Sequence, residues 1–193
     1  MKRRTGRAKR VTKETGVEVV VDLDGEGTAS VDTGIAFFDH MLLLFAYHGC
    51  FDLKVSARGD LKVDFHHTVE DAGICLGQAL AQAWGDKKGI RRYGASMLPM
   101  DEALALVSVD LGGRGWLVYN SRGRKIKIGD FNVGLVPQFL KAVCDHACAT
   151  IHVNVLYGQD PHHILEAVFK GLGRAFSQAV EKQPRRKGAP STK

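Results

Sequence analysis

The chain has 193 residues, 45% of them hydrophobic and 25% charged, and a formal net charge of +6. This composition suits one compact domain of moderate size or two small fused units. No apolar run approaches the roughly 20 residues that span a bilayer, and residues 1–4 are not followed by the apolar region of a signal peptide. We therefore expect a cytoplasmic protein without a membrane partner.

Hydrophobic periodicity and turn residues predict the same element order in both halves of the chain. The elements expected in the first half are strands at 17–23 and just after the turn at 25–27, a helix at 35–47, strands at 53–57 and 61–65 around the turn at 58–60, and a helix at 68–84. Those expected in the second half are strands at 104–110 and 116–119, a helix at 133–148, a strand at 150–156 and a helix at 164–180.

The repeated order predicts an α/β fold of the α+β sandwich kind, in which strands form one layer and helices the other. We expect a single domain over residues 1–193, built by internal duplication from two sheet-plus-two-helix halves packed with pseudo-twofold symmetry. The repeats are predicted at about residues 10–90 and 91–182, with a junction near 85–94 and a basic tail at 183–193.

Two nearly identical pentads carry the duplication most clearly. They are HHTVE at residues 66–70 and HHILE at 162–166, which lie 96 positions apart (162 minus 66). In a helix, residues three or four apart share one face, so each pentad can present imidazole and carboxylate groups together. One pentad has too few ligands for a metal site. Two of them predict two sites with nitrogen and oxygen ligands, which suit Mn, Fe or Co, or zinc at lower coordination.

The basic residues and the cysteines lead to plainer expectations. Much of the positive charge lies in the two tails without a recognised nucleic-acid motif, so solvated or anion-binding tails are favoured over a nucleic-acid partner.

The cysteines fall in apolar stretches without CxxC spacing and are expected to be buried thiols; they are Cys50, Cys75, Cys144 and Cys148.

Several segments, in order and at matching spacing, resemble the imidazoleglycerol-phosphate dehydratase family. These segments are residues 38–42, 59–60, 66–71, 99–103, 162–167 and 169–170. The likeness runs from Arg10 to the end of the chain and implies the monofunctional hydro-lyase of histidine biosynthesis, which converts imidazoleglycerol phosphate to imidazole acetol phosphate. The hydrogen lost from carbon in this reaction is not acidic. The expected route therefore passes through a metal-bound imidazolate and a diazafulvene-like intermediate before a carboxylate removes the proton.

The resemblance also implies roles for individual residues. One of two Mn²⁺ ions would be held by His40, His66, Glu70 and His163. The other would be held by His67, His162, Glu166 and one further ligand. Candidates for proton transfer are Glu166, Glu14 and Glu70, and those for lining the substrate pocket are Glu14 and His48. Candidates for binding the substrate phosphate are Arg92, Arg114, Lys170, Ser191, Thr192 and Lys193.

One departure from the family pattern affects the second metal site. Gln138 stands where family members carry His or Glu, and an amide is a poorer ligand than either. His146 and His152 are the available substitutes. The weaker ligand keeps open a metal-assembled structural or storage protein without catalysis. A nucleic-acid-binding module that uses the tails is the third possibility.

The resemblance further implies a homo-oligomer of twenty-four subunits with active sites between protomers. Each predicted metal site mixes both repeats, so it need not close within one chain. Metal binding would then be coupled to assembly.

Overall fold

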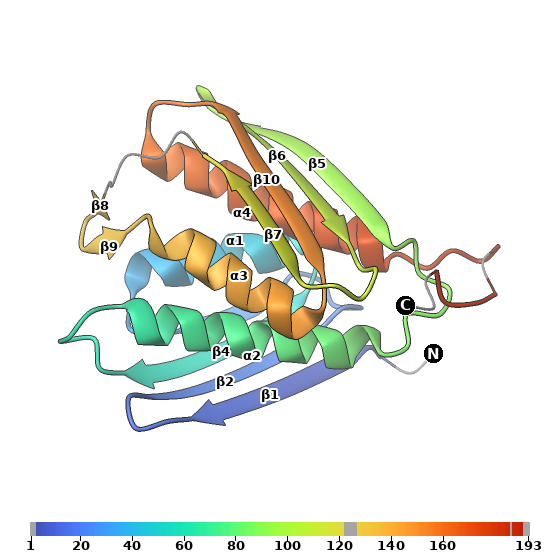
Figure 1. Ribbon diagram of the computed structural model, residues 1–193, viewed down its shortest axis with the longest axis horizontal. Coiled ribbons are helices and arrows are strands. Elements are labelled where there is room, and N and C mark those ends of the chain that lie inside the picture. The colour runs from blue at the N-terminus through green and yellow to red at the C-terminus, as the bar shows by residue number, and fades with distance from the viewer. Residues whose placement is uncertain (1–2, 122–126, 186, 191–193) are drawn as a thin grey trace.

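Two four-stranded sheets form the outer layers of the molecule, and four helices lie between them (Figure 1). The computed structural model describes residues 3–121, 127–185 and 187–190. The duplication expected from the pentads is confirmed, because both halves have the same architecture. Among the described residues, no helix is long and apolar enough to cross a membrane.

The first half pairs its strands in the order β1-β2-β4-β3. Its elements are β1 (Thr5–Val11), β2 (Thr15–Asp22), β3 (Ala29–Asp32), α1 (Ala36–Gly49), β4 (Asp52–Gly59) and α2 (His66–Trp84). Strand β3 runs parallel to β4, whereas β1 and β2 continue the sheet in antiparallel fashion.

The second half repeats this topology in the order β5-β6-β10-β7. Its elements are β5 (Tyr93–Met100), β6 (Ala103–Asp110), β7 (Trp116–Asn120), α3 (Leu135–Ala147), β10 (Thr150–Tyr157) and α4 (Pro161–Val180). A small extra hairpin, formed by β8 (Lys127–Ile128) and β9 (Phe131–Asn132), precedes α3.

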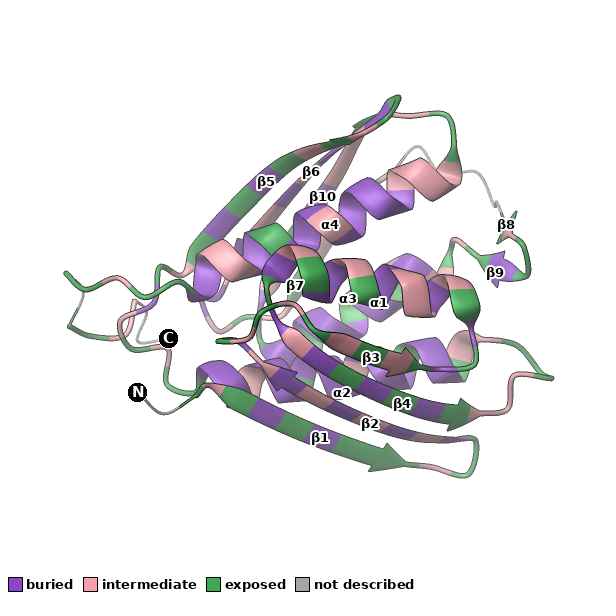
Figure 2. Ribbon diagram, turned by 180° about the vertical axis from the view of Figure 1, so that it is seen from behind, coloured by how far each residue is buried: buried purple, intermediate pink, exposed green. Residues whose placement is uncertain are grey.

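Each sheet buries one face against the helices. In β2 and β6 every second residue is buried, as the period of a strand covered on one side requires. Figure 2 shows the same alternation of buried and exposed residues along β1 and β5. Helix α2 packs on the first sheet and α4 on the second, while α2 contacts α3 and α4 contacts α1 across the centre. The two halves therefore share one core.

A glycine in the first strand of each half sets how closely the long helix approaches. A Cβ on Gly6 would lie 1.9 Å from the carbonyl oxygen of Ala79 in α2, and one on Gly94 would lie 1.9 Å from that of Ala175 in α4. These helix residues are 96 apart, like the pentads. The close approach of strand to helix is thus duplicated together with the side chains of the pentads.

The expected helices are present, with ends shifted by up to three residues, but three local expectations were wrong or incomplete. Strands β1 and β5 were not predicted. The strand expected at 61–65 is a turn leading into α2, because β4 is already paired on both edges by β2 and β3. Cys75 and Cys144 are buried as expected. Cys50 and Cys148 are instead exposed, because they form the left-handed C-caps of α1 and α3.

Candidate metal and substrate site

Both pentads begin a long helix, and an aspartate two residues earlier fixes each start. The backbone N–H of His66 donates to Asp64 Oδ1 at 2.8 Å, and that of His162 donates to Asp160 Oδ1 at 2.8 Å. The two aspartates are 96 positions apart (160 minus 64). Residue numbers rise in the same direction along α1 and its neighbour α4, and likewise along α2 and its neighbour α3, so the helices of each pair are parallel. The two pairs also run in the same direction as each other (Figure 1). Both pentads consequently lie at the same end of the helical layer (Figure 1).

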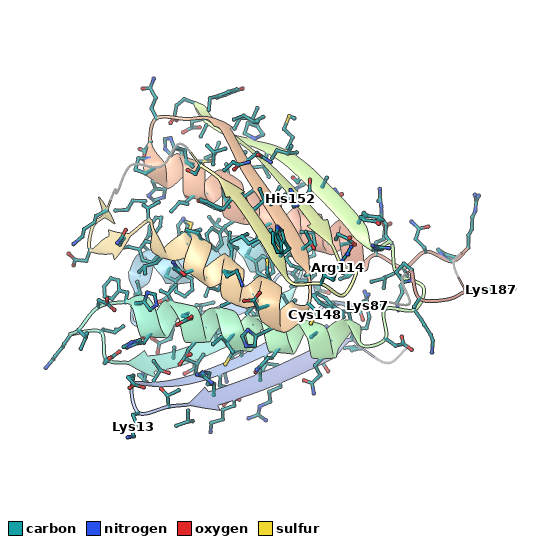
Figure 3. All side chains as sticks on the ribbon, in the orientation of Figure 1. Lys13, Lys87, Arg114, Cys148, His152 and Lys187 are labelled. Atoms are coloured by element: carbon teal, nitrogen blue, oxygen red, sulfur yellow. The ribbon has the colours of Figure 1, made fainter. Side chains whose placement is uncertain are left out.

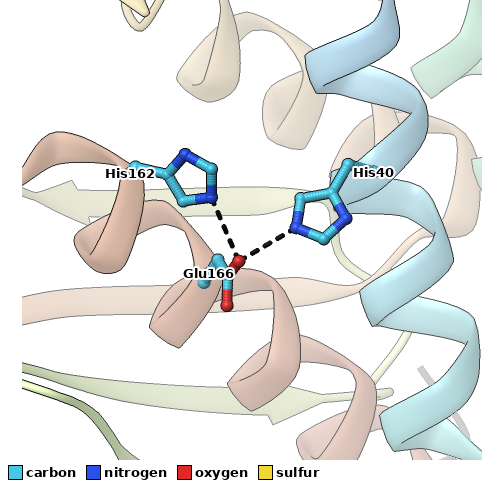
Figure 4. Close-up of side chains that lie close together, drawn as sticks. All are labelled: His40, His162 and Glu166. Atoms are coloured by element: carbon cyan, nitrogen blue, oxygen red, sulfur yellow. Dashed lines mark hydrogen bonds and ion pairs between the residues drawn. The ribbon is translucent and has the colours of Figure 1, made fainter.

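Two histidines, His40 on α1 and His162 on α4, converge on one carboxylate oxygen of Glu166 (Figure 4). Glu166 Oε1 lies 2.9 Å from His40 Nε2 and 3.1 Å from His162 Nε2. The three ligand atoms all lie within 4.8 Å of one another. In the described part of one chain, this triad is the one group of three or more such side chains close enough to share an ion.

Lys170, one turn further along α4, holds the other oxygen of Glu166. Its Nζ lies 2.6 Å from Glu166 Oε2, and Glu166 is only 8% exposed. Burial raises the pKa of Glu166, but the hydrogen bonds from Lys170, His40 and His162 lower the pKa by a larger amount, so that it falls to about 2. Glu166 is therefore a carboxylate at neutral pH. His48 lies farther along α1, and burial and the charges of Lys170 and Arg174 lower its pKa.

The chemistry of the triad fits a first-row divalent metal. In the metal-free chain, Nε2 of His40 and Nε2 of His162 each donate to Glu166, and a bound ion would take the place of these protons. The triad then offers two imidazole nitrogens and one carboxylate, which are ligands that Mn, Fe, Co and Zn accept. Three protein ligands leave coordination positions for other groups. The triad thus supplies some, but not all, of the ligands of a metal centre.

The other half carries a weaker version of this arrangement. His66 Nε2 and Glu70 Oε2 lie 3.6 Å apart, and the side chain of Glu70 is 48% exposed, against 11% for Glu166. Helix α3 packs on α2 as α1 packs on α4, so exposed Gln138 takes the place that His40 has in the first arrangement. Ile74 stands where α4 has Lys170. The two halves therefore differ in both ligand strength and charge.

The second histidine of each pentad contacts a carboxylate outside the pentad. His67 Nδ1 lies 3.0 Å from Asp60 Oδ2, and His163 Nδ1 lies 2.7 Å from Glu102 Oε2. A hydrogen bond to Asp60 raises the pKa of His67, and one to Glu102 raises that of His163. Asp60 and Glu102 stand within the family-like segments, but the sequence reasoning gave them no role.

Within one chain, the predicted metal ligands are grouped differently from the sequence expectation. His40 was expected with His66, Glu70 and His163, yet it contacts Glu166 and His162, because α1 packs along α4 and not along α2. His66 and Glu70 remain a separate pair on α2. One chain does not bring the two pentads together into either predicted set.

The candidate phosphate-binding arginines lie at the opposite end of the helical layer. The backbone N–H of Arg92 donates to the carbonyl of Ala179 at 2.9 Å, near the end of α4. Sixteen residues separate Ala179 from His163 (179 minus 163), which is about 24 Å of helix at about 1.5 Å per residue. Exposed Arg114 lies just before β7, next to the C-terminal end of α3, on the side of Lys87 and Lys187 in Figure 3.

Two phosphate candidates already have carboxylate partners. Arg92 forms a two-point ion pair with Asp110, with Nε–Oδ1 at 2.6 Å and Nη2–Oδ2 at 3.1 Å. Its Nη1 donates to the carbonyl of Pro190 at 3.2 Å, which brings the basic tail to this end of the molecule. Lys170 is paired with Glu166. The remaining candidates, Ser191, Thr192 and Lys193, lie outside the described residues.

Comparison with known proteins identifies the family. Residues 33–176 match the sequence profile named imidazoleglycerol-phosphate dehydratase. The chain belongs to the imidazoleglycerol-phosphate dehydratase family. The family member from Syntrophobacter fumaroxidans is 56% identical over 191 residues, covering 99% of this chain and 97% of that protein. The one from Geobacter metallireducens is 56% identical over 184 residues, covering 95% and 94%.

Solved structures of the dehydratase family have the same fold. The crystal structure from Staphylococcus aureus has a TM-score of 0.83 at 36% identity and covers 93% of this chain and 99% of that one. The structure from Pyrococcus furiosus, in complex with (S)-C348, has a TM-score of 0.81 at 36% identity, with coverages of 92% and 96%. The α+β fold with two similar halves, expected from the sequence, is thereby confirmed.

Proposed function

We propose that this chain is a hydro-lyase that dehydrates imidazoleglycerol phosphate to imidazole acetol phosphate in histidine biosynthesis, with Mn²⁺ as its cofactor. The observation that carries the proposal is the triad of His40, His162 and Glu166 in a chain of the dehydratase family. The names of its relatives support the substrate, and the ligand types support the metal.

The triad would hold one ion, and the pentad on α2 would contribute to the other. Bound beside the substrate, the metal supplies Lewis-acid polarisation, which lowers the pKa of a coordinated imidazole N–H. The buried negative charge of Glu166 would attract the cation, while Lys170 offsets that charge when no metal is present. The exposed pair on α2, with Gln138 beside it, is proposed to be the weaker site.

Proton transfer is assigned to carboxylates other than Glu166. Both oxygens of Glu166 are already engaged, one by His40 and His162 and the other by Lys170. A carboxylate with a pKa of about 2 is also a weak base at neutral pH. Exposed Glu14, on the β1–β2 turn near His67, is the better candidate for moving the carbon-bound proton, with Glu70 as the second.

We infer that more than one chain forms each active site. An imidazole ring with a three-carbon phosphate chain cannot bridge the roughly 24 Å between the pentad on α4 and Arg92. A second copy that brings its Arg92, Arg114 and tail to the pentads of the first would complete the site. Closed symmetric assembly is the usual way to satisfy such an arrangement, and the family resemblance puts the number of subunits at twenty-four.

Product formation tests this proposal. Purified protein is stripped with a chelator, and ketone formation from imidazoleglycerol phosphate is followed before and after Mn²⁺ is restored. We expect turnover that requires Mn²⁺ and that is lost in the H162A variant. Mn²⁺ binding and assembly without product would contradict the catalytic proposal and favour a metal-assembled structural protein.

A further inference from the structure

The hydrogen bonds of His67 and His163 determine which ring nitrogen can bind a metal. A carboxylate accepts hydrogen bonds and cannot donate one, so the nitrogen facing it must carry the proton. In both residues that nitrogen is Nδ1, at 3.0 Å from Asp60 and 2.7 Å from Glu102. A neutral imidazole with its proton on Nδ1 has its lone pair on Nε2. Nε2 is thus the ligand atom of each histidine, and that of His163 makes no hydrogen bond but lies 3.7 Å from Asp101 Oδ2.

The two carboxylates come from different places in the duplicated fold. Strands β1 and β5 begin 88 positions apart (93 minus 5), so Glu102 in the second half corresponds to Glu14 in the first (102 minus 88). Glu14 nevertheless forms no hydrogen bond with His67 among the described residues. Asp60, which follows β4, takes that position instead. The same contact has therefore been built twice from different positions, which indicates that the contact itself matters.

Glu102 is held more firmly than Asp60. Its Oε1 accepts the backbone N–H groups of Gln159 at 3.0 Å and Asp160 at 2.8 Å, which leaves Oε2 for His163. The backbone bond from Asp160, the bond from His163 and the backbone bond from Gln159 lower the pKa of Glu102 to about 2. By contrast, the Oδ1 of Asp60 is buried and has no hydrogen-bond partner in the described part of the chain.

We propose that Asp60 and Glu102 are positioning residues that hold the proton on Nδ1 of His67 and His163 and so direct Nε2 of each ring to a metal ion. The inference rests on the proposed Mn²⁺ cofactor and on the ligand roles that the family resemblance implies for His67 and His163. Metal-bound histidines commonly donate their second N–H to a carboxylate or carbonyl in this way. The carboxylate fixes the tautomer and the ring orientation before the metal arrives.

The E102Q variant is the sharpest test, because the backbone determines how the new amide is oriented. The two backbone donors retain the amide oxygen at the position of Oε1, so the amide nitrogen faces His163. An amide N–H there would donate to Nδ1 and favour the tautomer with its proton on Nε2, which must leave that atom before it can bind a metal, so binding is weakened. In D60N no backbone donor fixes the orientation of the amide. The amide oxygen can therefore accept the hydrogen bond from Nδ1 of His67, and the ring keeps its proton on Nδ1.

The experiment measures Mn²⁺ affinity by electron paramagnetic resonance of the free ion, in the full-length assembled protein. We expect E102Q to bind Mn²⁺ about 10- to 100-fold more weakly, D60N to lose less affinity, and E18Q to match the unaltered protein. Glu18 is a matched control, because it pairs with Arg7 at 2.6 Å on the outer face of the first sheet. The ¹⁵N shifts of the metal-free histidine rings report the tautomer independently of binding.

The outcomes separate this inference from the proposed function. If the unaltered protein binds no Mn²⁺, the metal proposal fails and the inference fails with it. If the unaltered protein and E102Q bind equally well and show the same ring tautomer, the positioning role alone is wrong. Weaker binding by E102Q, with the proton moved to Nε2 and unchanged circular dichroism, supports the inference.

Discussion

Glu166 and Lys170 form a nearly buried ion pair that the fold has placed beside two histidines. Their side chains are 11% and 15% exposed, so neither charge is well solvated. Removing one partner of such a pair is costly, because the other charge remains buried and unpaired. This residue-scale balance allows Glu166 to stay ionised and ready for a cation.

The E166Q variant tests this balance. Without the carboxylate, Lys170 loses its partner, and we expect the free energy of unfolding of the metal-free protein to fall by about 3 kcal/mol. The E166Q/K170M double variant should recover part of this loss, because no buried charge is left over. Urea denaturation gives both values. Equal stability of E166Q and the unaltered protein would show that the pair is already solvated.

Glu102 predicts a pH dependence of stability. Its pKa is lowered from 4.5 to about 2 in the folded chain, so its contribution is fully present above about pH 4.5 and is lost as the pH falls toward 2. The stability gap between the unaltered protein and E102Q should therefore narrow over this window. Urea midpoints measured at several pH values check this. A gap that stays constant across the window would contradict it.

At the scale of elements, the glycines in β1 and β5 determine how the helices pack on the sheets. The G6A variant places a methyl group against the backbone of α2, which cannot move aside as a flexible side chain can. We expect the free energy of unfolding to fall by about 1–3 kcal/mol, the usual cost of overpacking. G16A is the matched control in β2, since a Cβ there meets nothing within 4 Å. Equal urea midpoints for the two variants would contradict this packing.

The same glycines explain why β1 and β5 were not predicted. The residues of β1 that face α2 are small, Gly6 and Ala8, so the strand lacks the alternation of large apolar residues that identified β2. The opposite error occurred at residues 61–65, where Leu61, Val63 and Phe65 alternate as in a strand. Val63 is 73% exposed and lies in a turn, because β4, the strand just before it, already pairs with β2 and β3.

The sequence predicts the ligand types of the candidate site, and the grouping of these ligands into two sites stays a prediction that a single chain does not test. Ligand types and pentad spacing were readable from the sequence, since both follow from helix geometry. Which helices pack together depends on the tertiary fold, so the contact of His40 with Glu166 was not predicted. The contacts of Asp60 with His67 and of Glu102 with His163 were not predicted for the same reason, because each joins a turn to a helix that packing brings near.

In the whole molecule, the pentads lie far from Arg92 and Arg114, at opposite ends of the helical layer. One chain carries the triad at one end of its helices and two phosphate-binding candidates, Arg92 and Arg114, at the other, whereas the candidate Lys170 lies beside the triad. A subunit on its own should thus be inactive. Catalysis then depends on assembly, and any mutation that weakens assembly should lower turnover without touching a ligand.

Subunit complementation shows whether an active site is completed between two chains. The H67A variant lacks a candidate metal ligand and R114A a candidate phosphate-binding residue, and each alone is expected to be inactive. Chains carrying different tags are unfolded together, reassembled with Mn²⁺ and purified through both tags. We predict that the mixed assemblies regain turnover, because some sites combine the intact pentads of one chain with the intact Arg114 of another. Mixed assemblies that form but stay inactive would contradict a site completed between chains.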